Sequence, residues 1–303
     1  MDFQDQLNAI ISDNQPLTAA GLTFLSDLPS AERATLALLW PAGSVERRRK
    51  IVTTLVQVAE DNIEYNFDTT LTVLLADSDP QVRRRAVEGL VEDESTSTLR
   101  LLLTVLESDA DAGVRAAAAV ILAPAALRAE TGKVKRELAD RLRDSLLQAV
   151  RDPAADPDVR RRALEAVGYF GGHAEVETAI ARAYAESGLL PASAVHAMGR
   201  NMNTRWMPTL LKEAQSAQPV MRFAAAQALG ELGERANAPA LLPLLDDDDA
   251  EVQLAAVWAL GQLGGRVAQQ ALQMLGDDLD PALQEAVNEA LAEIRHADNP
   301  LTP

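Results

Sequence analysis

The chain of 303 residues contains no cysteine, only three histidines and few aromatic side chains, which make up 4% of the residues. The lack of cysteine excludes disulfides, iron–sulfur clusters, thiolate zinc sites and a cysteine nucleophile. An interior built mainly from Ala, Leu and Val favours closely packed helices over a β-sandwich, which would carry more aromatic and β-branched residues. We therefore expect an all-α protein.

Basic residues are outnumbered, with 28 Lys and Arg against 45 Asp and Glu, a net charge of −17. Such a field would repel a phosphate backbone unless a basic patch were segregated on one face, so we expect no nucleic-acid partner. No uninterrupted apolar run approaches the length of about 18 residues that a membrane span needs. The N-terminal sequence also lacks the basic segment of a signal peptide, so we expect a cytoplasmic protein without a membrane span.

The sequence also lacks recognisable catalytic, metal-binding and phosphate-binding motifs. His173, His196 and His296 are not spaced as ligands of one metal, and none is followed by Glu. The acidic run 246–249 lacks the alternation and the glycine of a calcium loop and fits a solvated turn between helices. The stretch 168–173, "GYFGGH", ends a helix and so is a C-terminal cap rather than a phosphate loop. We predict no catalytic residue, no metal site and no cofactor.

What the sequence does contain is a repeat. The apolar residue that opens the pattern Val-Arg-x-x-Ala, here called the anchor, recurs at Val82, Val114, Val159, Leu190, Met221, Val252 and Leu283. The last five anchors are each 31 residues apart, whereas the first two intervals are 32 and 45. Positions 0, +4, +7, +8 and +11 from each anchor form one apolar helical face, and another apolar helix precedes each anchor. Each unit is therefore predicted as helix A, an acidic turn and helix B.

This pattern resembles the HEAT repeat, in the short form of phycobilisome-lyase-type HEAT-like repeats. The stretches "LLDDDDAEVQLAAVWALGQLGG" and "ALLPLL" carry the resemblance, which extends over about residues 67–295. It implies a right-handed α-α superhelix, a HEAT-type solenoid of about seven to eight helix–turn–helix units. We expect an irregular N-terminal helical cap over 1–44 and repeats over 45–303. An insertion around 123–145 is expected to form a loop and a lengthened helix A.

Arginine triplets occur at 47–49, 83–85 and 160–162. The resemblance implies that an arginine at position +1 pairs with acids of the turns and forms a ladder between repeats. The arginines assigned to this ladder are Arg83, Arg115, Arg160 and Arg222. Arginines at +2 and +3 should be more exposed and could form a basic stripe; they are Arg84, Arg85, Arg161 and Arg162.

Positions +2, +6, +9 and +10 of helix B point away from the apolar face, and in stacked HEAT units that side lines the concave surface. This predicts a partner-binding groove at Tyr169, His196, Phe223, Gln227, Leu254 and Trp258. Aromatic residues are enriched at binding hot spots. Neighbouring A helices or acidic turns could instead cover these side chains. Glycine at +9 would flatten the groove and suit close approach of a partner's backbone.

Two functions remain open at this point. The first is a non-catalytic scaffold that binds a protein or peptide partner in the concave groove. The alternative is a phycobilisome-lyase-like protein that binds or transfers an open-chain tetrapyrrole, which the resemblance alone implies.

Overall fold

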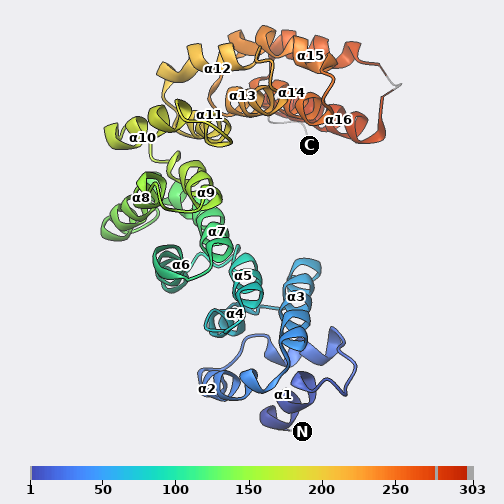
Figure 1. Cartoon of the computed structure of the whole chain (residues 1–303). Helices are drawn as coiled ribbons and strands as arrows, with labels where there is room; N and C mark the ends of the chain where they lie inside the picture. Colours follow the sequence, from blue (N-terminus) through green and yellow to red (C-terminus); the bar gives the residue numbers. More distant parts are fainter. Residues whose placement is uncertain (1, 277–278, 299–303) are drawn as a thin grey trace. The chain divides into compact units, whose positions relative to one another are not determined.

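The computed structural model describes residues 2–276 and 279–298, and over these residues it contains helices and no strand (Figure 1). The predicted all-α fold is confirmed, and it consists of helix–turn–helix units as expected for a HEAT solenoid. The chain forms two compact units, Met1–Ala125 and Ala126–Pro303, and each is described by itself. All seven anchors are buried.

The first unit begins with short helices and continues with paired ones. Its elements are α1 (Phe3–Ile11), η1 (Ala20–Leu25), α2 (Ser30–Leu39), η2 (Trp40–Ala42), α3 (Val45–Asp61), α4 (Asp68–Leu74), α5 (Pro80–Glu88), α6 (Thr96–Ser108) and the first part of α7 (Ala112–Glu130), where η marks a 3-10 helix. Ser44 and Asp79 cap α3 and α5 by accepting hydrogen bonds from the first free backbone N–H groups. The division into a cap over 1–44 and repeats from 45 stays a prediction.

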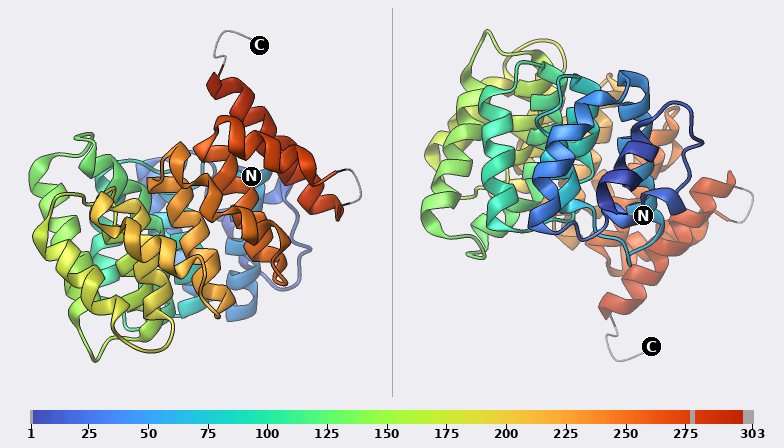
Figure 2. Two further views of the ribbon diagram at one scale, coloured as in Figure 1. Left: turned by 90° about the horizontal axis from the view of Figure 1, so that it is seen from above. Right: turned by 90° about the horizontal axis from the view of Figure 1, so that it is seen from below.

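The second unit contains the regular part of the repeat. Its elements after α7 are α8 (Arg136–Arg151), α9 (Pro157–Val167), α10 (Ala174–Tyr184), α11 (Leu190–Arg200), η3 (Thr204–Trp206), α12 (Met207–Glu213), α13 (Pro219–Leu232), η4 (Arg235–Ala240), η5 (Leu242–Asp246), α14 (Ala250–Leu263), α15 (Gly265–Met274) and α16 (Pro281–Asp298). The B helices α9, α11, α13, α14 and α16 pack in succession, each against the next. Figure 2 shows the last three, coloured orange to red, following one another.

One helix A is not α-helical. The segment before the anchor Val252 forms the two 3-10 helices η4 and η5, which contain Pro239 and Pro243. A proline has no backbone N–H and its ring clashes with the preceding turn of an α-helix, so two prolines four residues apart break the α-helical hydrogen bonding. The segment still buries Leu244 and Leu245, as a helix A should.

The extra residues between Val114 and Val159 lie mainly in two long helices. The B helix α7 has 19 residues and the A helix α8 has 16, and only residues 131–135 connect them. Sequence analysis expected a loop and a lengthened helix A, and did not foresee the lengthening of α7, which continues through Pro124. By length and composition alone α7 could cross a membrane, which is weak evidence because buried core helices meet the same criterion.

A recurring close contact joins the B helices of the second unit. The glycines at +9 face the alanines at +7 of the next B helix, and the pairs are Gly168–Ala197, Gly199–Ala228, Gly230–Ala259 and Gly261–Ala290. A Cβ atom built on Gly199 would lie 2.6 Å from the Cα of Ala228, a separation that real structures do not show. We call these four contacts the Gly–Ala seam. The expectation that these glycines leave room for a partner's backbone was wrong, because the next helix fills that room.

Candidate functional site

The arginines assigned to the ladder connect successive turns in three of four cases. Each of the three pairs through two hydrogen bonds with an acid in the turn of the following unit: Arg83 with Asp109 (2.8 and 2.8 Å), Arg160 with Glu186 (2.9 and 3.0 Å) and Arg222 with Asp247 (2.6 and 2.6 Å). The same side chains also donate to backbone carbonyls that precede their own helix, at Asp77, Val150 and Ser216. Arg83 and Arg222 therefore each link two turns, and Arg160 links the C-terminal end of α8 to the turn that contains Glu186.

The fourth ladder arginine and the first triplet depart from this pattern. Arg115 donates to the carbonyls of Asp109 and Ala110, both in its own turn. In the first triplet, Arg48 pairs with Asp77 at 2.9 Å and Arg49 with Asp79 at 2.6 Å. Sequence reasoning missed Arg48 and Arg49 as pairing residues, although the triplet itself was the available signal.

The ladder shifts the ionisation of its acids. Hydrogen bonds from Arg49 and Arg222 lower the pKa values of Asp79 and Asp247. Burial raises the pKa of Asp109, but its hydrogen bonds with Arg83 and with a backbone N–H outweigh burial and lower it. The carboxylates are thus held in their charged form.

The arginines predicted as a basic stripe all have acidic neighbours. Arg84 and Arg85 pair with Glu88 at 2.9 and 3.2 Å. Arg161 pairs with Asp158 at 2.8 Å, and Arg162 with Glu165 at 3.0 Å. These residues therefore form two patches of mixed charge, one in each unit.

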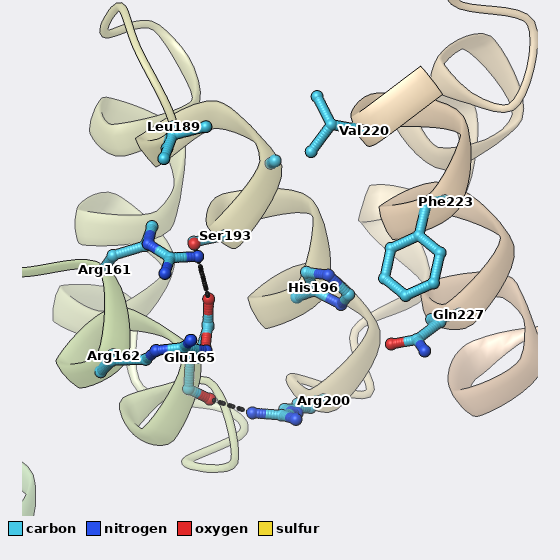
Figure 3. Close-up of a pocket in the computed structure, with 11 residues that line it drawn as sticks. Arg161, Arg162, Glu165, Leu189, Ser193, His196, Arg200, Val220, Phe223 and Gln227 are labelled. Carbon is cyan, nitrogen blue, oxygen red and sulfur yellow. Dashed lines mark hydrogen bonds and ion pairs between the residues drawn. The ribbon is translucent and has the colours of Figure 1, made fainter. Parts of the chain in front are cut away.

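A pocket of about 330 Å³ lies in the second unit among α9, α11 and α13 (Figure 3). Its lining combines three predicted groove residues, His196, Phe223 and Gln227, with the stripe residues Arg161 and Arg162. The remaining lining residues are Glu165, Leu189, Ala192, Ser193, Arg200 and Val220. This pocket is the candidate site.

Glu165 holds the charged side of the pocket together. Its carboxylate accepts hydrogen bonds from the Ser193 hydroxyl at 2.6 Å and from Arg162 at 3.0 Å, and a nitrogen of Arg161 lies 3.7 Å away. Ser193 is 1% exposed and has no other side-chain partner in the described chain. Two guanidinium groups thus share one carboxylate, which leaves donors of both facing the pocket.

His196 lies between this charged cluster and Phe223. Its ring meets the Phe223 ring edge to face, with centroids 5.8 Å apart. Burial, with smaller effects from Arg200, Arg161 and Arg162 and against the attraction of Glu165, lowers the pKa of His196 to about 4. The imidazole is therefore neutral near pH 7 and can both donate and accept a hydrogen bond.

Arg200, which lines the same pocket, was not assigned to the site from the sequence. Its guanidinium lies over the Tyr169 ring at 5.0 Å and donates to the backbone carbonyl of Glu165 at 3.0 Å. Its Nε lies 3.8 Å from Glu231 and makes no hydrogen bond within the described residues. Burial raises the pKa of Glu231, against the attraction of Arg200. Position +10 on an outward-facing side was the signal that could have identified Arg200.

The last two predicted groove residues lie on α14, outside the pocket lining. Leu254 is half-buried and Trp258 is 41% exposed. The Trp258 ring covers Gly230 of α13, where a built Cβ would lie 2.5 Å from ring atom Cζ3. Tyr169 is half-buried beneath Arg200. Neither Phe223 nor Trp258 is enclosed by neighbouring helices.

Residues 2–276 and 279–298 contain no group of three or more His, Asp or Glu side chains placed to hold a metal ion. The site consists instead of guanidinium groups, one shared carboxylate, a neutral imidazole, an amide and partly exposed apolar side chains. Such a set recognises a ligand by ion pairing, hydrogen bonding and apolar contact.

The profile of the HEAT-repeat family matches residues 67–155 and 207–292, more than half of the chain. The chain therefore belongs to the HEAT-repeat family. No curated protein matches it.

Solved structures of low sequence identity resemble the fold. An engineered protein is 18% identical with a TM-score of 0.47, over 96% of this chain and 88% of its own. The complex of CpcE and CpcF of phycocyanin lyase from Nostoc sp. PCC7120 is 17% identical with a TM-score of 0.49, over 75% and 94%. Human deoxyhypusine hydroxylase is 19% identical with a TM-score of 0.32, over 96% and 95%.

Proposed function

We propose that this protein is a non-catalytic scaffold that binds a segment of a protein or peptide partner. The binding surface is formed by positions +2 and +6 of α9, α11, α13, α14 and α16, here called the B-helix face, and includes the pocket. The proposed location is the cytoplasm. The observation that carries the proposal is the pocket itself, where Phe223, His196, Gln227 and Arg200 all contribute to one lining.

The mixture of groups on this face supports a peptide-like ligand. Phe223 and Trp258 offer partly exposed rings, and buried aromatic contacts supply much of the affinity at protein interfaces. Gln227 and the neutral His196 can pair with backbone N–H and C=O groups, which every peptide carries. Arg200 adds a charged group whose Nε is buried and whose Nη1 and Nη2 make one hydrogen bond among the described residues.

The test is affinity capture from a lysate with the full chain and two variants. Phe223→Ala removes the ring at the pocket, and Met274→Ala removes an 85% exposed apolar side chain on α15 as the matched control. We expect mass spectrometry to find proteins that the parent chain and Met274→Ala retain but Phe223→Ala loses. Equal capture by all three would contradict the placement of the site.

The tetrapyrrole alternative is tested with the same three proteins. An open-chain tetrapyrrole is added to each, and its absorption spectrum is recorded. A scaffold for peptides leaves the spectrum unchanged. A shifted and intensified band that depends on Phe223 would replace the scaffold proposal by the alternative.

A further inference from the structure

The B-helix face changes its chemical character from helix to helix. From α9 to α16, position +2 is occupied in order by Arg161, Ala192, Phe223, Leu254 and Glu285. Position +6 is occupied in the same order by Glu165, His196, Gln227, Trp258 and Glu289. Equivalent positions of packed helices lie beside one another, so these residues form two parallel rows. The rows begin with a basic and an acidic residue, become apolar and aromatic, and end with two acids.

The α9–α11 end offers sites for an anion. Three guanidinium groups, those of Arg161, Arg162 and Arg200, line the pocket together with one carboxylate, that of Glu165. In the part of the chain that the structure describes, Nη1 of Arg200 donates to one carbonyl and its Nε is buried, so the donors left for a ligand are the remaining N–H groups of Nη1 and Nη2. A carboxylate suits such a group because a guanidinium can bind it through two parallel hydrogen bonds.

The middle of the face offers apolar contact. Val220 and Trp258 are 43% and 41% exposed, and Phe223 and Leu254 are half-buried. These four side chains lie on the adjacent helices α13 and α14. A large apolar or aromatic side chain of a ligand would be removed from water here.

The α16 end offers sites for a cation. Glu285 and Glu289 are exposed, lie one helical turn apart and form no ion pair with any described residue. Like charges at this spacing repel each other, and a ligand cation placed between them would relieve the repulsion.

Resting on the proposed function, we infer that the B-helix face binds an extended peptide segment that carries a carboxylate, a large apolar side chain and a basic side chain in that spatial order. The carboxylate meets Arg200, the apolar side chain lies over Phe223 and Trp258, and the basic side chain meets Glu285 and Glu289. Packed helices are about 8–10 Å apart, so three steps from α11 to α16 span roughly 24–30 Å. An extended chain covers that distance in about eight residues.

The experiment selects binders from a phage-displayed library of random dodecapeptides against the full chain. Peptides that also bind Phe223→Ala are discarded. We expect the remaining peptides to share an acidic and a basic residue about eight positions apart with an aromatic or large apolar residue between them. Synthetic copies are made with free and with amidated C-termini, which separates a side-chain carboxylate from a terminal one.

Two charge changes then test the polarity of binding. Arg200→Gln is expected to weaken binding of a selected peptide at least tenfold, and to have less than a twofold effect once the peptide's acid is replaced by its amide. The double change Glu285→Lys and Glu289→Lys should weaken the same peptide but strengthen a copy whose basic residue is replaced by Glu. Because both glutamates are exposed, this second variant remains informative even where Arg200→Gln disturbs folding.

The outcomes separate the two proposals. Phe223-dependent peptides without the acid–apolar–base pattern, or peptides insensitive to both charge changes, would overturn this inference and leave the scaffold function standing. The absence of any Phe223-dependent peptide would count against the scaffold function, and against this inference with it.

Discussion

At the scale of single residues, the pocket places a neutral histidine in one lining with charged side chains. His196 lies against the Phe223 ring, and it is influenced by Glu165 and by Arg200, Arg161 and Arg162. Three nearby positive groups and burial all oppose a proton on its ring, and only the Glu165 carboxylate favours one. The consequence is a site whose hydrogen-bonding pattern stays constant through the neutral pH range.

His196 should make the protein less stable in mild acid. Its pKa of about 4 in the folded chain lies below the ordinary value of 6.5, so the unfolded chain binds the proton more readily between these two values. Stability is therefore lost as the pH falls below about 6.5, by roughly 2 kcal/mol at pH 5 from this residue alone. Urea unfolding at pH 7 and pH 5 measures the loss, and His196→Gln is expected to reduce it by that amount. An unchanged loss in the variant would show that His196 titrates normally.

At the scale of helices, the units are joined in two different ways. The Arg222–Asp247 pair and its equivalents connect the turns, while the Gly–Ala seam connects the B helices. The unit with the anchor Leu190 has Pro191 instead of arginine at position +1, so the arginine ladder is interrupted there. The seam continues there without interruption through Gly199 and Ala228.

Arg222→Ala should destabilise the second unit by roughly 1–3 kcal/mol, because the nearly buried Asp247 carboxylate loses both hydrogen bonds from Arg222 and keeps the one from the backbone N–H of Asp249. Arg84→Ala, which removes an exposed pair with Glu88 in the first unit, is the control and should cost that unit less than about 0.5 kcal/mol. Denaturant unfolding at pH 7 compares the two. Since pairing lowers the pKa of Asp247, the contribution of this pair is present above about pH 3.9 and is lost as the pH falls through the lowered value.

Gly199→Ala should destabilise the second unit by about 1–3 kcal/mol, because its new Cβ would meet the backbone of Ala228 and force α11 and α13 apart. Gly113→Ala is the matched control. Its Cβ would meet only side-chain atoms, Oδ1 of Asp111 at 3.1 Å and Nη1 of Arg84 at 3.9 Å, and its effect should stay within about 1 kcal/mol. Equal effects of the two substitutions in denaturant unfolding would contradict a close contact at the seam.

At the scale of the molecule, periodicity predicted the repeated helices because their apolar face is local in sequence. The positions of Val82 through Leu283 were sufficient to predict buried anchors. The neighbours of the +9 glycines could not be predicted from periodicity. Whether Gly230 faces a binding partner or Trp258 depends on how α13 and α14 pack. Likewise, the close grouping of Arg200, Glu165 and His196 requires α9 and α11 to be in contact, which no single helix specifies.

A change in one compact unit should leave the other unit's stability unaltered, as expected for repeat arrays whose stability is a sum of neighbouring contacts. Gly199→Ala should speed amide hydrogen exchange in α11 and α13 and leave exchange in α3 and α5 unchanged. Asp77→Ala, which removes the partner of Arg48 and Trp40, should do the reverse. Hydrogen exchange measured by mass spectrometry distinguishes independent units from a single cooperative unfolding transition. In a single transition, either substitution would speed exchange in all four helices.

The Gly–Ala seam bears on how this stretch of chain could change in length. Each of the B helices α11, α13 and α14 presents alanine to the preceding B helix and glycine to the following one, so it can pack against a copy of itself. A tandem duplication of 31 codons would therefore add a unit that uses the existing Gly–Ala contact. Copy number, rather than local chemistry, then sets the extent of the array. Modules added between α11 and α16 would lengthen the array but leave its two differently charged ends unchanged, the arginines near α9 and the glutamates of α16.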